Sequence, residues 1–384
     1  MIRLAIRNVF RNTRRSLLTA GMVTLGSALL CVAIAWIDGV FAQVLEMATS
    51  SSGHVRVVQP EYAELEKMMP LYANVEGVQS ISDEIGSLKS VTAAYPRISV
   101  GVLITNTDEI GEHFALLMGA PLEMYSDQYE LKSQLTDGSQ WFEKPGDLLL
   151  GRKVAEQLDA QLGQEIRMNG MTQDGSFSGI KGRLVGIVAG DNPVQERQAF
   201  VSLEQVQYLT NMPAAATEIL VFGADRTWDK VIVSEMEGLD SLKGLTVEPW
   251  STREPWAGMV AMASVIAWIL MVVIIFIASL GVWNTMTMSV MERTGEIGVL
   301  RAMGMKRFRV VGLFVLEALM IGVLGGLLGV LLGGACAYYL EVVGVGIGED
   351  VIDNMDDTVL FSRIIRADLS VFAVTLTFMT AISM

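Results

Sequence analysis

Ser289-Val-Met-Glu-Arg-Thr-Gly-Glu-Ile-Gly-Val-Leu-Arg-Ala-Met-Gly304 is a charged, helix-compatible stretch that lies between two long apolar runs. No Asp, Glu, Lys or Arg occurs from Ala257 to Met291, and Glu317 is the only one from Val310 to Leu340. About 20 helical residues cross the roughly 30 Å hydrocarbon core of a bilayer, so both runs predict spanning helices. The stretch between them therefore predicts a helix at one membrane face.

This connector mixes apolar with charged side chains, which a plain loop does not need but a protein-docking surface does. At 3.6 residues per turn, Arg293, Glu296, Ile297, Leu300 and Arg301 share one side of a helix. We therefore predict that the connector contacts a partner protein. The predicted contact residues are Glu292, Arg293, Glu296, Ile297, Leu300, Arg301, Met303 and Gly304.

The connector resembles the FtsX-like permease family of ABC transporters, closest to the lipoprotein-releasing LolC/LolE type and related to the MacB membrane part. The matching residues are Glu292-Arg293-Thr294, Glu296-Ile297-Gly298, Leu300-Arg301-Ala302, Gly304, Arg307 and Leu316-Glu317-Ala318. The family often carries arginine where this chain has Gly295. The resemblance implies that the connector is a coupling helix seated in a groove of a separate ABC ATPase dimer. ATP and Mg would then bind to that partner, and this chain would bind no cofactor.

Composition and charge independently predict a membrane protein. The chain has 384 residues, of which 51% are apolar, and its mean hydropathy is +0.43. Residues 38–256 hold 32 acids and 16 bases, whereas the connector 291–309 holds five bases and two acids. Because basic residues beside spans mark the cytoplasmic side, the N-terminus and the connector are predicted inside and 38–256 outside.

These patterns predict an α-helical membrane protein with four transmembrane helices and a large α+β extracytoplasmic domain inserted between the first and second. The predicted segments are a cytoplasmic amphipathic helix at 1–16, spans at 17–37, 257–284, 310–340 and 368–384, the extracytoplasmic domain at 38–256, the coupling helix at 285–309 and an extracytoplasmic loop at 341–367.

The two ends of the chain carry separate expectations. Arg3, Arg7, Arg11 and Arg14 recur at helical spacing, which fits either an amphipathic helix on an anionic inner leaflet or plain topology arginines. The following 21-residue apolar run favours an uncleaved anchor over a twin-arginine signal peptide. The last span stops at Met384, 16 residues beyond Asp368, and has no basic tail, so we expect the sequence to be truncated there.

The extracytoplasmic domain reads as mixed α and β. Short strands are predicted at Val55–Val58, Val91–Ile104, Leu148–Leu150, Arg183–Ala189, Ala199–Ser202, Glu218–Phe222 and Thr246–Val247, and helices at Glu61–Met69, Arg152–Leu162, Leu203–Leu209 and Trp228–Met236. By resemblance to LolE-type permeases, residues about 45–113 and 200–255 would form one lobe and about 114–199 an inserted second lobe. The segment Met171–Lys181 is rich in Gly and Ser and predicts a loop. Its Phe177 and Ile180 are candidates for contact with a periplasmic partner, but a solvated hairpin tip is the favoured interpretation.

The third predicted span carries a run of glycines and one acid. Glycines four residues apart let two helix backbones approach closely in lipid, so they predict helix packing, either within the chain or with a second permease. Glu317 is predicted to hold neighbouring helices together near the cytoplasmic edge, and a role in a proton relay is the alternative. The predicted packing residues are Gly322, Gly325, Gly326, Gly329, Gly333 and Glu317.

Patterns of catalytic chemistry are missing from the sequence. It contains no Gly-Lys pair and hence no P-loop, so an ATPase is expected on another chain. His54 and His113 are the only histidines, and neither lies in a zinc or triad motif. Cys31 and Cys336 both fall inside predicted spans, so we expect no disulfide. Because no catalytic or metal-binding motif is found, we also expect no catalytic residue and no metal site. The acidic domain also disfavours nucleic acid as a partner.

The leading function is the non-enzymatic permease subunit of an ABC transporter, which couples ATP hydrolysis to movement of its periplasmic domain. Lipoprotein release from the inner membrane of a Gram-negative bacterium is the favoured role. Alternatives are an FtsX-type scaffold that controls a cell-wall hydrolase, and efflux of peptides or small molecules with a periplasmic adaptor. The expected partners are the ATPase dimer, a second permease chain, membrane lipids and a periplasmic carrier, adaptor or hydrolase.

Overall fold

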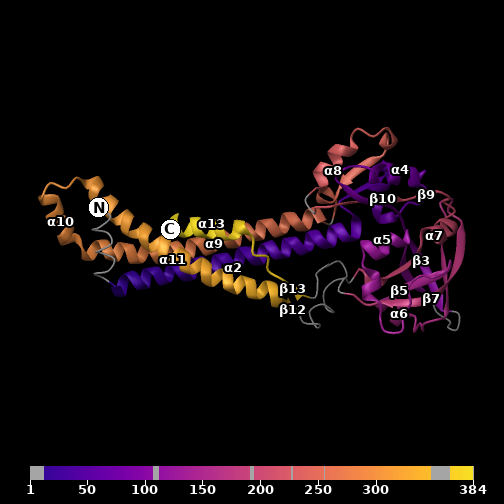
Figure 1. The fold of residues 1–384 in the computed structure, drawn as a ribbon, viewed down its shortest axis with the longest axis horizontal. Coiled ribbons are helices and arrows are strands. Elements are labelled where there is room, and N and C mark those ends of the chain that lie inside the picture. Colours follow the sequence, from indigo (N-terminus) through magenta and orange to yellow (C-terminus); the bar gives the residue numbers. More distant parts are fainter. Residues whose placement is uncertain are drawn as a thin grey trace. The chain divides into compact units, whose positions relative to one another are not determined.

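The computed structural model describes residues 13–106, 112–190, 194–225, 228–254, 256–346 and 364–383 (Figure 1). The described residues fall into two compact units. The helical unit contains the described residues up to Gln43, those from Met259 to 346 and those from 364 onward. The mixed unit contains the described residues of Val44–Gly258. The predicted amphipathic helix at 1–16 lies outside the described residues except for its last four positions.

Long apolar helices make up the helical unit. They are α2 (Thr13–Ser52), α9 (Trp256–Glu292), α11 (Arg307–Val343) and the shorter α13 (Val371–Ser383). None contains proline, and a helix satisfies all its backbone hydrogen bonds internally, as a lipid environment requires. By length and composition, three of these described helices could cross a membrane, namely α2, α9 and α11. The 13-residue α13, at the place of the predicted fourth span, is shorter than a crossing needs.

The connector is shorter than the predicted helix at 285–309. Its helix, α10, covers only Thr294–Ala302, because α9 runs on to Glu292 and α11 already begins at Arg307. The sequence before Glu292 offers no proline or charge that would stop α9. Arg293 has φ −99° and ψ 15° and separates α9 from α10, while Gly304, at φ +90°, ends the connector.

The start of α13 is fixed to α2. Ser370 donates a hydrogen bond to the Asp38 carboxylate at 2.7 Å, and the Asp368 N–H donates to the Ala35 carbonyl at 2.8 Å. Before α13, β12 (Val345–Gly346) pairs with β13 (Ile364–Ile365). The rest of the predicted loop at 341–367 lies mostly outside the described residues.

A nine-stranded sheet organises the mixed unit, in the order β11-β1-β10-β3-β4-β8-β5-β7-β6. Because β3 also pairs with β6, the strands from β3 to β6 in this order close on themselves into a barrel. The strands are β1 (Val55–Val58), β3 (Val91–Asn106), β4 (His113–Ala120), β5 (Asp147–Gly151), β6 (Glu165–Met171), β7 (Phe177–Val188), β8 (Gln198–Ser202), β10 (Glu218–Gly223) and β11 (Thr246–Pro249), and β2 (Val75–Glu76) pairs separately with β9 (Ala215–Ala216).

The predicted second lobe, about 114–199, is not a self-contained fold. It supplies most of the barrel strands, but the barrel closes only through β3, which lies outside it. The 16 residues of β3 serve both halves: its first part pairs with β10, and its later part pairs with β4 and β6. One long strand therefore joins the two halves into one sheet.

Short helices cover the sheet and its ends. They are α3 (Pro60–Glu64), α4 (Val78–Gly86), α5 (Leu122–Asp127), α6 (Arg152–Gln157), α7 (Leu203–Thr210) and α8 (Asp229–Met236), with single 3-10 turns η1 (Glu66–Met68), η2 (Leu131–Gln134), η3 (Gln195–Arg197), η4 (Asp240–Leu242) and η5 (Trp250–Thr252).

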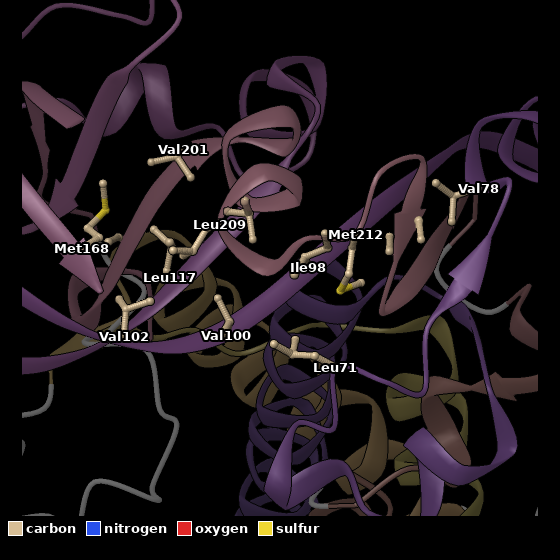
Figure 2. Packing of buried hydrophobic residues seen from close by; sticks show 14 of the residues in the cluster. Leu71, Val78, Ile98, Val100, Val102, Leu117, Met168, Val201, Leu209 and Met212 are labelled. Atoms are coloured by element: carbon tan, nitrogen blue, oxygen red, sulfur yellow. The ribbon is translucent and has the colours of Figure 1, made fainter. Parts of the chain in front are cut away.

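One apolar core runs through both halves of the mixed unit. Ile98, Val100, Val102 and Ile104 alternate along β3 and are 0–5% exposed, as expected for the buried face of a strand. Figure 2 shows Ile98, Val100 and Val102 in the same core as side chains of other barrel strands and Leu209 of α7. The shared core explains why the two halves fold as one unit.

Buried charges form a ladder across the sheet. Arg56 lies opposite Glu248 in the pairing of β1 with β11, and Arg97 lies opposite Glu218 in the pairing of β3 with β10. Arg97 Nε donates to Glu218 Oε1 at 2.9 Å, and its Nη1 donates to the Tyr129 hydroxyl at 2.7 Å. Burial alone would raise the pKa of Glu218, but the charges of Arg97 and Arg56 outweigh it and lower that pKa below its ordinary value.

The ladder predicts a loss of stability in acid. A carboxyl whose pKa is depressed by folding stabilises the protein above its unfolded pKa, about 4.3 for Glu, and this contribution is lost as pH falls through the folded pKa. In Glu218→Gln, the buried Arg97 loses its charge partner, which costs about 3–5 kcal/mol. We expect a lower melting temperature at pH 7 and a weaker decline below about pH 4 than in the wild type, measured by thermal unfolding of the full chain in detergent.

Glu165→Gln is the control for this prediction. Glu165 pairs with Lys181, and the two side chains are 52% and 55% exposed. Exposed pairs contribute about 0–1 kcal/mol, so this variant should melt close to the wild type. Equal melting temperatures for Glu218→Gln and the wild type at pH 7 would contradict the role of the ladder.

Candidate functional site

The connector helix α10 presents mostly exposed side chains. Glu296 and Arg301 are exposed, whereas Ile297 and Leu300 are half-buried. Met303, which caps the helix, is 72% exposed. Glu292 and Gly304, on either side of the helix, are exposed as well. The connector therefore carries charged and apolar groups on an accessible surface.

Arg293 is placed differently from the predicted contact surface. Its side chain is only 7% exposed, and its Nη1 donates to both oxygens of Glu317, at 3.0 and 3.2 Å. Arg293 therefore does not belong to the exposed surface of the connector, and its position gives the predicted direct contact with a partner no support. A buried charge requires a partner, and Glu317 on α11 of the same chain supplies it.

Glu317 lies on α11, and its side chain is also 7% exposed. The structure brings it together with Arg293, a residue of the connector, although the two are 24 positions apart in the sequence. The carboxylate thus links the connector to α11, as expected of a residue that holds helices together. No residue pattern in the sequence identified Arg293 as its partner.

Three of the α11 glycines face α2. A Cβ atom on Gly325 would lie 2.8 Å from Val23 Cβ, and one on Gly333 would lie 2.6 Å from the Ala28 carbonyl oxygen. A Cβ atom on Gly329 would likewise lie too close to the Thr24 carbonyl oxygen and to the Ser27 side chain. The Thr24 hydroxyl donates to the Gly325 carbonyl at 3.2 Å. The helix backbones therefore approach closely, and only glycine fits on the α11 side.

The other two glycines face α13. A Cβ on Gly322 would lie 2.9 Å from the Ala381 carbonyl oxygen, and one on Gly326 would lie 2.8 Å from Ala381 Cβ. All five glycines named by the sequence are buried and contact helices of the same chain. Of the two alternatives for the partner of these glycines, the structure provides the intrachain one.

The segment 171–181, predicted as a loop at a hairpin tip, is a β-hairpin with a shorter turn than expected. Met171 pairs with Phe177 and Met168 with Ile180, so the turn comprises only residues 172–176. Phe177 is 84% exposed, whereas Ile180 is partly buried and packs on the apolar core. Ile180 is therefore not available as an exposed contact, because strand alternation turns its side chain inward.

Arg253 is a functional candidate that the sequence did not reveal. Its Nη2 donates to the carbonyls of Ser52 and Gly53, at 3.0 and 3.5 Å, where α2 ends. Its own carbonyl accepts a hydrogen bond at 2.8 Å from Ala257 at the start of α9. Burial, together with repulsion from Arg56, lowers the pKa of its guanidinium to about 10. Arg253 thus joins the end of α2 to the beginning of α9.

Metal chemistry has no visible site in the part of the chain that the structure describes. No three His, Cys, Asp or Glu side chains of these residues are grouped closely enough to hold a metal ion. Cys31 is buried in α2 and Cys336 is exposed on α11, and the two are not bonded.

Two family models match the chain. Residues 268–384 match the FtsX-like permease C-terminal model, and residues 16–234, more than half of the chain, match the MacB-like periplasmic core domain. The chain belongs to the MacB-like family of ABC transporter permeases. The family predicted from the connector is thereby confirmed, and so is a large extracytoplasmic domain of the MacB type.

Several known proteins are similar to parts of the chain. The chain is 23% identical over 370 residues to the macrolide export ATP-binding/permease protein MacB of Wolinella succinogenes, covering 89% of this chain and 54% of that protein. It is 25% identical over 203 residues to the lipoprotein-releasing system transmembrane protein LolE of Haemophilus influenzae, covering 50% of this chain and 48% of that protein. The chain thus spans about half the length of these two relatives. The periplasmic region of MacB from Actinobacillus actinomycetemcomitans aligns with 52% of this chain and 89% of its own, with 15% identity and a TM-score of 0.38.

The glycine contacts can be tested with two neighbouring residues. In Gly333→Ala the new methyl group meets Ala28 and Cys31, whereas in Gly334→Ala the nearest side chain, Leu369, is 3.9 Å away. Overpacking costs about 1–3 kcal/mol, and Ala is about 1 kcal/mol better than Gly in a helix. We expect Gly333→Ala to lower the melting temperature and Gly334→Ala to leave it unchanged or raise it. Equal effects of the two variants would contradict the close approach of α2 and α11.

Proposed function

We propose that this permease couples ATP hydrolysis by a partner ATPase dimer to movement of its extracytoplasmic domain. The observation that carries the proposal is the continuity of α2 and α9. Each helix, of 40 and 37 residues, begins in one compact unit and ends in the other without a break. A helix transmits displacement along its axis because its hydrogen-bonded backbone resists bending and stretching. Arg253 supports the proposal, since it ties the two helices together where they enter the mixed unit.

The contact with the ATPase is proposed to be α10 together with its flanking residues. Glu292, Glu296 and Arg301 would supply charge, and Ile297, Leu300 and Met303 would supply apolar area. ATP and Mg would bind to the ATPase, because these 384 residues contain no P-loop sequence. Two permease chains, identical or closely related, would face the two subunits of the ATPase dimer.

Two cargo classes have support from the relatives. Lipoprotein release is favoured by the similarity to LolE, and export of small molecules by the similarity to MacB, which extends over 89% of this chain. A periplasmic carrier would serve the first role and an adaptor the second, with Phe177 as a candidate contact. Release of a labelled lipoprotein from spheroplasts, compared with the change in macrolide tolerance of whole cells, distinguishes the two roles.

The contact at α10 predicts a specific loss of ATPase binding. Removing a central apolar anchor from an interface costs about 2 kcal/mol or more, which is roughly a 30-fold weaker association. We expect Leu300→Ala and Glu296→Arg to weaken co-purification of the ATPase while the permease still inserts and melts normally. Binding is measured with the two purified proteins in detergent or nanodiscs.

Glu46→Arg is the matched control, because Glu46 is an exposed acid on α2 in the mixed unit. It should bind the ATPase like the wild type. Normal complex yield and transport in both α10 variants would contradict α10 as the contact with the ATPase. The mass of the wild-type complex tests the second permease, because one permease chain per two ATPases would contradict it.

The proposed location is the inner membrane of a Gram-negative bacterium, with the mixed unit in the periplasm and α10 in the cytoplasm. Asp174, in the hairpin turn, and Arg301, on α10, are both exposed. In a Cys336→Ser background, we expect an impermeant maleimide to label Asp174→Cys in cells whose outer membrane alone is permeable. Arg301→Cys should be labelled only after lysis, and the reverse pattern would overturn the topology.

A further inference from the structure

The ion pair between Arg293 and Glu317 lies at a bend in the chain. The backbone of Arg293 is not helical, yet its N–H donates to the Val290 carbonyl at 3.2 Å and its carbonyl accepts from Ile297 at 3.0 Å. Arg293 therefore lies both at the end of α9 and at the start of α10. Any change in the angle between these helices must pass through this residue, since its φ and ψ set that angle.

The side chain of Arg293 fastens this bend to the interior of α11. Glu317 lies ten residues after Arg307, the first residue of α11, which corresponds to about 15 Å along the helix axis. Both side chains are 7% exposed, and one guanidinium nitrogen, Nη1, makes both bonds to the carboxylate. Among the described residues, Arg293 Nε has no hydrogen-bond partner, so Glu317 is the group that holds this cation.

Beyond Glu317, α11 is held tightly against α2. Gly325, Gly329 and Gly333 meet the backbone and Cβ atoms of α2, and the Thr24 hydroxyl bonds to the Gly325 carbonyl. Contacts this close leave no room for one helix to slide past the other, because a shift along the axis would bring larger side chains into the glycine positions. A displacement of α11 is therefore imposed on α2.

We propose that the Arg293–Glu317 pair is a positioning element that transmits movement of α10 to α11 and, through the glycine contacts, to α2. This inference rests on the proposed docking of the ATPase at α10. The contiguous route is α10, Arg293, Glu317, the glycines of α11, and then α2, which continues to Ser52. The docking helix is then connected to the extracytoplasmic domain in two ways, directly through α9 and indirectly through α11 and α2.

A buried charge pair suits this role better than an apolar contact. Dispersion contacts tolerate sliding, whereas separating two buried opposite charges leaves both uncompensated and is strongly unfavourable. Apolar residues of similar volume often replace a buried pair without loss of stability, so the pair contributes geometry rather than folding energy. Removing both charges together should therefore uncouple the route without unfolding the chain.

The experiment compares a double apolar variant, Arg293→Met with Glu317→Leu, with the wild type and with Arg293→Lys. Each full-length permease, in a Cys336→Ser background, carries an environment-sensitive fluorophore on Glu46→Cys of α2 and is reconstituted with its ATPase in nanodiscs. Three quantities are measured: the melting temperature, the amount of ATPase bound, and the change in fluorescence on addition of ATP and vanadate.

The double apolar variant is expected to melt like the wild type and to bind ATPase within about twofold of it. Its fluorescence change should fall at least about fivefold, the lower end of the usual coupling between sites. Arg293→Lys keeps a cation that can reach one carboxylate, so it should retain most of the change. A structural role alone would lower the melting temperature or ATPase binding and would not separate the lysine variant from the apolar one.

Two outcomes overturn the inference: a wild-type fluorescence change in the double apolar variant, or loss of the change in Arg293→Lys despite normal ATPase binding. Failure of the proposed function has a different signature, because the wild type would then bind no ATPase, and Leu300→Ala would have nothing to weaken.

Discussion

The close approach of α2 and α11 is the contact on which the helical unit depends. Apolar side chains gain little by leaving lipid for another helix, so association in a bilayer relies on dispersion and weak hydrogen bonds, both of which require short distances. Gly325, Gly329 and Gly333 provide those distances by omitting a side chain at every fourth residue. Gly322 and Gly326 extend the same principle to α13 on an adjacent face of α11. As a result α11 has neighbours on two sides and little freedom to move alone.

Buried charges define geometry in both units, but they are assembled in different ways. In the mixed unit, strand register places Arg97 opposite Glu218 and Arg56 opposite Glu248, so the sheet itself creates the pairs. In the helical unit, a bend between α9 and α10 delivers Arg293 to Glu317. A buried pair adds little net stability but strongly penalises any arrangement that separates the charges. The ladder thus favours one register of the sheet, and the Arg293–Glu317 pair favours one position of the connector.

Much of the fold followed from local patterns, and the misses have physical causes. The strand at Val55–Val58 and the helix beginning at Arg152 were predicted where they occur. A valine-rich run marks the strand, and Val154, Ala155 and Leu158 at helical spacing mark the helix. The strand at His113–Ala120 was missed, since both its faces are largely covered and its sequence does not alternate. The segment around Phe177 was predicted as a loop at a hairpin tip from its Gly and Ser content, so the extent of its strands was missed. Those residues pair as strands only because β6 supplies the partner backbone.

The sequence by itself determined the apolar runs, the alternation of basic and acidic flanks, the missing P-loop and the family signature of the connector. These are properties of residues close together in the sequence, because the composition of each segment determines by itself whether it lies in lipid or in water. Only the tertiary structure decided that Arg293 turns inward to Glu317, that the α11 glycines meet α2 about 300 positions away, and that β3 closes the barrel. Such contacts depend on which surfaces meet after the segments have formed. One side chain in the same local sequence can face either a partner protein or its own chain, and only the packing of distant segments decides between them.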